Sequence, residues 1–126
     1  MIGDDSMAKT HKDLEVWQLA VDFTTDVYRA TDSYPRHELF GLVSQLRRAS
    51  VSISSNIAEG AARQTTKEFV QFIYHSLGSA SEVETQLMVS LNLGYIDAET
   101  YDLLSSKQTQ LSRMMSGLIK SLKRRA

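Results

Sequence analysis

The sequence predicts an all-α protein, an antiparallel up-and-down four-helix bundle. Three observations lead to this fold class: few helix breakers, apolar residues that recur every three or four positions, and short connections between the periodic stretches. The chain has 126 residues, with only one proline and six glycines, and a chain of this length is expected to form one domain around one core. The predicted units are a disordered tail at 1–10 and one bundle domain at 11–126, with helices at 12–33, 39–62, 66–92 and 98–124.

The first predicted helix carries two adjacent apolar stripes. They are formed by Val16, Ala20, Phe23 and Val27, and by Leu14, Trp17, Val21 and Tyr28. Together the stripes make an apolar face that is wider than one partner helix would cover. Tyr34-Pro35 then ends the helix, because proline disfavours helical geometry in the residue before it.

Each of the other three helices carries one apolar seam with a repeat of about 3.5 residues, which is typical of packed helices. The seams are Leu39, Val43, Leu46, Ser50, Ile53, Ile57 and Gly60; Phe69, Ile73, Ser76, Ala80, Val83 and Leu87; and Leu104, Gln108, Leu111, Met115, Leu118 and Leu122. Ser50 and Gly60 are small, so a neighbouring helix is expected to approach closely there. Thr65 and Glu68 form a capping box at the start of the third helix. Gly94 suits the left-handed residue that follows this helix, and Asp97 suits the N-cap of the fourth.

Composition narrows the possible functions. The chain has no cysteine, which removes disulfides, thiolate zinc sites and thiol catalysis, and favours a cytoplasmic location. No run approaches the ~18 consecutive apolar residues of a membrane span, so no membrane partner is expected. The net charge is -1, but six bases and no acid follow Asp102. This positive C-terminal end is the main electrostatic feature of the sequence.

Patterns for catalysis and metal binding are absent from the sequence. A di-iron bundle needs Glu-x-x-His pairs on two helices, but no glutamate stands three positions before His11, His37 or His75. The many serines are not accompanied by a glycine-rich nucleophile elbow or phosphate loop. We therefore expect no metal, no cofactor and no enzymatic activity.

The basic side chains are one candidate binding surface. The first-choice contacts for nucleic acid are Lys120, Lys123, Arg124 and Arg125, with Arg47, Arg48, Arg63 and Lys67 behind them. Alternatively, the C-terminal bases only complement the negative end of the helix dipole. No aromatic residue interleaves with them along the chain to stack on bases.

Two polar stripes are the second candidate surface. The stripes are Gln45, Arg48, Ser52, Ser55, Glu59 and Arg63 on the second helix, and Glu68, Gln71, His75, Ser79, Glu82 and Gln86 on the third. Both stripes could be solvated faces. Alternatively, they meet another subunit through charge-assisted hydrogen bonds.

Several segments resemble the 23S rRNA intervening-sequence protein family. The matching segments are Lys12–Trp17 (KDLEVW), Gln45–Gly60 (QLRRASVSISSNIAEG), Gly78–Leu87 (GSASEVETQL) and Leu93–Ile96 (LGYI). The resemblance covers about 12–122, nearly the whole chain. One departure is Ser54, which stands where the family commonly has proline.

The resemblance implies a bacterial four-helix bundle that assembles into a ring-like homopentamer and has no enzymatic activity. A related bundle is the accessory variability determinant of diversity-generating retroelements, a pentameric barrel that binds nucleic acid and a reverse transcriptase. A ring needs a second interface on each subunit, so the resemblance favours subunit contacts through Arg48, Ser52, Asn56, Glu59 and Glu82. The related barrel is strongly basic, whereas this chain has a sequence pI near 6.3, which counts against carrying nucleic-acid binding across.

The leading hypothesis is a non-catalytic homo-oligomer, expected to be a pentameric ring, with RNA or another nucleic acid as its ligand. The alternative is a scaffold that binds another protein and touches no nucleic acid. Salt separates the two hypotheses, because phosphate contacts release counterions and weaken steeply as salt rises.

Overall fold

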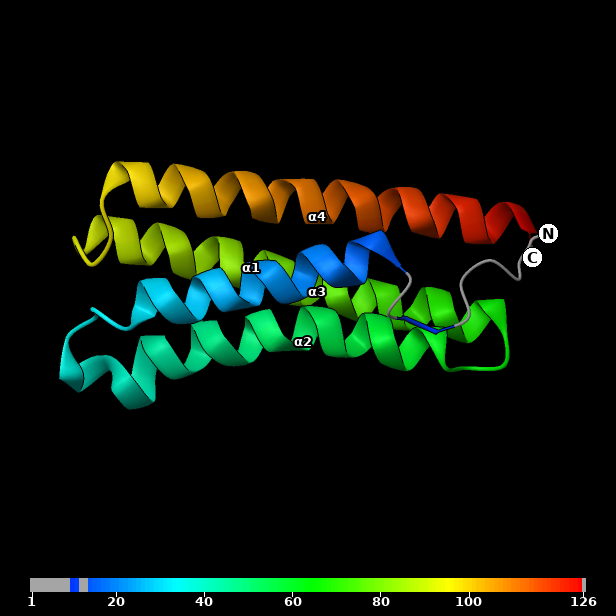
Figure 1. The fold of residues 1–126 in the computed structure, drawn as a ribbon, viewed down its shortest axis with the longest axis horizontal. Coiled ribbons are helices and arrows are strands. Elements are labelled where there is room, and N and C mark those ends of the chain that lie inside the picture. The colour runs from blue at the N-terminus through cyan, green and yellow to red at the C-terminus, as the bar shows by residue number, and fades with distance from the viewer. Residues whose placement is uncertain (1–9, 12–13, 126) are drawn as a thin grey trace.

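The computed structural model describes residues 10–11 and 14–125. The helices lie side by side along one long axis, each antiparallel to the next (Figure 1). Their bounds are α1 (Glu15–Thr31), α2 (Ser44–Ala61), α3 (Thr66–Asn92) and α4 (Ala98–Arg125). The described residues contain no strand, so the predicted all-α four-helix bundle is confirmed. The predicted tail at 1–10 lies outside the described residues except for Thr10, and so do residues 12 and 13 of the first predicted helix.

The segment between α1 and α2 differs from the straight helix predicted to begin at Leu39. A 3-10 turn (Arg36–Glu38) is followed by a π-helical turn (Leu39–Val43), and the backbone leaves helical geometry at Gly41 (φ -110°, ψ -111°). The Glu38 carboxylate holds this turn: it accepts a hydrogen bond from the Leu42 N–H (3.1 Å) and another from the Tyr95 hydroxyl (2.9 Å). A Cβ at Gly41 would lie 2.9 Å from Glu38 Oε1, so glycine leaves room for the carboxylate.

The hydrogen bonds of Glu38 lead us to expect that the stability of the protein depends on pH. The hydrogen bonds from the Leu42 N–H and the Tyr95 hydroxyl lower the pKa of Glu38 below its usual value. Because the folded-state pKa is the lower one, the stabilisation is present above the ordinary pKa of a glutamate and is lost as pH falls through the lowered pKa of Glu38. We expect Glu38→Gln to lower the melting temperature at neutral pH. The gap between parent and variant should close in acid, and a gap that is constant from pH 7 to 3 would contradict the role of the carboxylate.

The four seams meet in one core, as predicted. The largest fully buried side chains are Phe23, Leu46, Ile53, Ile57, Ile73, Leu87, Leu104, Leu111, Met115, Val27 and Val83. Leu39 was predicted to belong to the seam of the second helix, but it is 51% exposed because it lies in the π-helical turn, out of register with α2. An ion pair between Lys107 and Asp26 links α4 to α1 at the edge of the core.

Small residues let α2 and α3 approach closely, as expected at Gly60. A Cβ at that position would lie 2.8 Å from atoms of both Phe69 and Phe72. Nearby, the buried Ser76 hydroxyl donates to the Ile53 carbonyl across the two helices (2.8 Å). Glycine and serine therefore set the spacing of this helix pair.

Capping contacts confirm the predicted start of α3, the predicted end of α3 and the predicted start of α4. Thr65 Oγ1 accepts the Glu68 N–H (3.1 Å) at the start of α3, and Gly94 has a left-handed φ of 76° just beyond its end. Asp97 Oδ1 accepts the Thr100 N–H (2.7 Å) at the start of α4. These short connections fix the antiparallel order and so decide which helix ends meet.

Candidate functional site

One end of the bundle gathers basic side chains from separate parts of the chain. α2 ends, α3 begins and α4 ends there (Figure 1). The exposed bases at this end, which we call the basic end, are Arg63, Lys67, Lys120, Lys123, Arg124 and Arg125. Among the residues that the structure describes, the exposed acids at the same end are Glu15, Glu59 and Glu68. Bases therefore outnumber acids, and six of the eight predicted nucleic-acid contacts lie together.

Two aromatic rings lie among these bases. Lys123 Nζ donates a hydrogen bond to the Tyr74 hydroxyl (3.1 Å) and lies 5.4 Å from the ring centroid. Arg63 Cζ lies 4.7 Å from the centroid of the Phe72 ring. No aromatic residue interleaves with the C-terminal bases along the chain, but the fold brings Tyr74, from the first half of α3, to Lys123, 49 positions away in sequence. The available signal was that Tyr74 falls outside the apolar seam of its helix.

The other two predicted contacts lie away from the basic end. Arg47 clamps α1 to α2: its Nε donates to Thr31 Oγ1 (2.9 Å), and its Nη2 pairs with Asp32 Oδ1 (3.3 Å). Its guanidinium also stacks on Tyr28, 4.5 Å from the ring centroid. These contacts occupy the guanidinium and give Arg47 a structural role. Arg48 is exposed and lies on a different surface, between α2 and α3.

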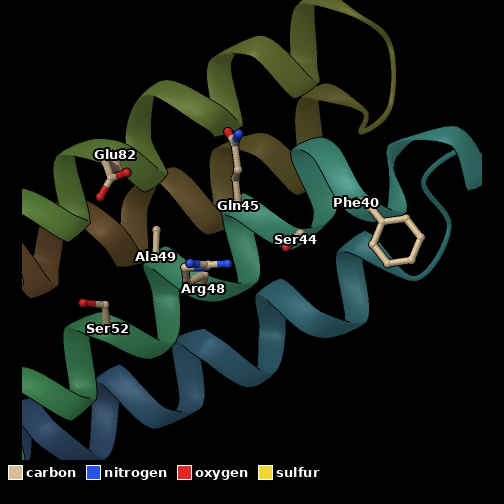
Figure 2. Close-up of a pocket in the computed structure, with 7 residues that line it drawn as sticks. All are labelled: Phe40, Ser44, Gln45, Arg48, Ala49, Ser52 and Glu82. Carbon is tan, nitrogen blue, oxygen red and sulfur yellow. The ribbon is translucent and has the colours of Figure 1, made fainter.

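That second surface is a depression of about 430 Å³ between α2 and α3, shown in Figure 2. Arg48 of α2 and Glu82 of α3 stand on its two sides (Figure 2). Both side chains are exposed, and neither forms an ion pair or hydrogen bond with any residue that the structure describes. An arginine and a glutamate without partners on one face can each pair with the opposite charge on another molecule.

The other predicted interface residues extend this surface toward the basic end. Ser52 Oγ accepts hydrogen bonds from Asn56 Nδ2 (2.9 Å) and Ser79 Oγ (3.0 Å), so these side chains form a polar floor. Ser52, Asn56 and Glu82 also line a second depression of about 530 Å³. Glu59 lies further along α2, where its carboxylate pairs with Arg63 (3.0 Å). We call the surface formed by Arg48, Ser52, Asn56, Glu59 and Glu82 the α2–α3 face.

Phe40 is a feature that sequence reasoning did not single out. It is 92% exposed and stands at the rim of the first depression (Figure 2). The π-helical turn places it there, next to the half-exposed Leu39. An aromatic ring in water gains nothing from the hydrophobic effect, and exposed apolar groups of this kind are typical of contact surfaces. Periodicity could not identify it, because the turn departs from helical spacing.

Two further observations concern the part of the chain that the structure describes. No three histidine, aspartate or glutamate side chains there are grouped so that they could hold a metal ion. None of its helices combines the length and the apolar character needed to cross a membrane.

The arrangement of helices occurs in another solved structure, a protein of unknown function from the S23 ribosomal protein family of Bacteroides thetaiotaomicron. The two structures agree with a TM-score of 0.76 at 23% sequence identity, over 83% of this chain and 98% of that one. No curated protein matches this chain. At the sequence level, the family described as 23S rRNA-intervening sequence protein matches residues 12–117. The chain therefore belongs to the 23S rRNA-intervening sequence protein family.

Proposed function

We propose that this protein is a non-catalytic homo-oligomer, a ring of five subunits, that binds RNA or another nucleic acid through its basic end. The observation that supports nucleic-acid binding is the meeting of bases from α4 with Arg63 and Lys67 at one end of the bundle. Lysine and arginine contacts to phosphate supply most of the affinity of non-specific nucleic-acid binding. A symmetric assembly repeats the basic end in every subunit and raises the local potential.

Most of these bases are available to a ligand. Lys67, Lys120, Arg124 and Arg125 form no ion pair with any carboxylate among the described residues. Arg63 shares its charge with Glu59, and Lys123 is held by the Tyr74 hydroxyl. Bases at the ends of α4 and α2 complement the negative ends of those helix dipoles. Lys67 lies in the first turn of α3, where a helix dipole does not favour a cation, so it points beyond a simple helix cap.

Binding should be tested by fluorescence anisotropy with labelled RNA and duplex DNA over a salt series. We expect Arg124→Gln/Arg125→Gln to reduce the slope of log affinity against log salt by about 1.5, since two phosphate contacts are lost. The control Arg29→Gln/Arg36→Gln removes the same charge from exposed positions far from the basic end and should leave the slope unchanged. Equal effects of the two variants, or no binding by the parent at low salt, would favour the alternative, a scaffold for another protein.

The α2–α3 face and Phe40 are our candidates for the subunit contact. Arg48 and Glu82 lack partners in the monomer, and burial of the Phe40 ring against a second copy would be favourable. Light scattering should give about five times the chain mass of 14.2 kDa. We expect Phe40→Ser to lower this mass toward that of a monomer.

The matched control for Phe40→Ser is Leu103→Ser, which changes an apolar side chain that is 56% exposed on α4. It should leave the mass unchanged. A parent protein that is monomeric would contradict the ring, and a loss of mass in both variants would show that Phe40 has no special role. The cytoplasmic location and the relation to the retroelement accessory determinant stay predictions.

A further inference from the structure

A third surface, a groove of about 580 Å³, runs between α3 and α4 on a different side of the bundle from the α2–α3 face. Its lining includes Ser81 of α3 and, on α4, Ser112, Arg113, Ser116, Gly117 and Lys120. The groove thus combines small hydroxyl side chains with two bases. Of this lining, the proposed function uses only Lys120, and it assigns no role to the groove itself.

The charge of the groove favours an anionic ligand. Arg113 and Lys120 are exposed, and neither forms an ion pair among the described residues. They stand seven residues apart on α4, so they lie on one face about 10 Å apart along the helix axis. Glu84 is the one acid in the lining. Two bases spaced along one axis can contact successive parts of a phosphate backbone.

Small side chains leave the groove open to a ligand. Gly117 adds no side chain to the groove, and a Cβ there would meet nothing within 4 Å. The serine hydroxyls can donate hydrogen bonds to phosphate or sugar oxygens.

The aromatic ring of Tyr74 lies beyond the end of the groove nearest the basic end, where it also lines the second depression of the α2–α3 face. Tyr74 lies one turn before Leu77 of the lining, and Lys123 lies one turn after Lys120. The hydrogen bond from Lys123 Nζ to the Tyr74 hydroxyl holds the ring in place across α3 and α4, and Tyr74 is 45% exposed. The nucleobases of a single strand stack on such rings with little sequence preference, while lysine and arginine side chains nearby contact the phosphate backbone.

We infer that the α3–α4 groove binds single-stranded nucleic acid, with phosphates at Lys120 and Arg113 and one base stacked on Tyr74. The inference rests on the proposed function and deepens it, because it names the form of nucleic acid and the path that the strand takes from the basic end along the bundle.

The test uses fluorescence anisotropy of the full chain with a short oligo(U) RNA and with an RNA duplex of the same length. We expect Tyr74→Leu to weaken oligo(U) binding about tenfold, as for the loss of one stacked base, with little effect on the duplex. Tyr74→Phe keeps the ring and should bind oligo(U) as the parent does. Light scattering of each variant should confirm that the assembly is unchanged.

A second pair of variants tests the groove without changing charge. Gly117→Leu fills the groove and should also weaken oligo(U) binding, whereas Gln110→Leu adds the same side chain to an exposed part of α4 outside the lining and should not. One outcome would overturn the groove and leave the proposed function standing. In that outcome, Tyr74→Leu and Gly117→Leu do not weaken oligo(U) binding more than duplex binding, while Arg124→Gln/Arg125→Gln still lowers the slope of log affinity against log salt. If the parent binds neither RNA at low salt, both are overturned.

Discussion

Replacement of Phe23 by alanine is expected to lower the free energy of unfolding by about 3–5 kcal/mol, the usual cost of truncating a buried phenylalanine. Phe23 is 1% exposed and belongs to the seam through which α1 joins the core. The loss corresponds to a fall in melting temperature of roughly 10–20 °C for a domain of this size. The melting temperature is measured by circular dichroism. The protein concentration is kept fixed, because any subunit association adds to the apparent stability.

The control for Phe23→Ala is Val21→Ala on the same helix. Val21 is 36% exposed, and most substitutions at the surface change stability by no more than about 0.5 kcal/mol. If the two variants melted at the same temperature, α1 would not be packed on the core as described.

Gly60→Val is expected to lower the free energy of unfolding by about 3 kcal/mol, which is in the upper part of the range for a side chain that overpacks a core. Its Cβ would lie 2.8 Å from Phe69 Cδ1 and from Phe72 Cβ, and 3.2 Å from the Phe69 carbonyl oxygen. The last of these is backbone, so α3 itself must move away. Urea denaturation monitored by circular dichroism gives the change directly.

Gly117→Val is the matched control for Gly60→Val. It places the same side chain on a helical glycine with nothing within 4 Å of the new Cβ, so its effect should stay within about 0.5 kcal/mol. Similar losses in the two variants would mean that valine itself, and not the close approach of α2 and α3, destabilises the bundle.

The fold was predictable because its determinants are local. The seams, the capping residues Thr65 and Asp97 and the left-handed Gly94 act within a few positions of the helix ends that they specify. The turn before α2 was not predictable in the same way. It depends on a hydrogen bond between Glu38 and Tyr95, which are 57 positions apart in sequence, so periodicity could not show that Leu39 and Phe40 leave the helix register.

The candidate site was predictable only in part. Antiparallel order alone brings the bases of α4 to the end where α2 meets α3, but it does not give the register of two neighbouring helices. The contact between Tyr74 and Lys123 depends on that register. Arg47 was grouped with the other bases for the same reason: its partners Thr31 and Asp32 belong to a different part of the chain.

Charge is unevenly distributed along the bundle in spite of the formal charge of -1. The end opposite to the basic end carries the exposed carboxylates Asp97, Glu99 and Asp102 at the start of α4, which Arg29 and Arg36 balance only in part. Antiparallel helices largely cancel one another's backbone dipoles, so these side chains set the polarity. A polyanion therefore exerts a torque on the approaching molecule and turns the basic end toward itself before contact, which makes the rate of encounter more sensitive to salt than the net charge would suggest.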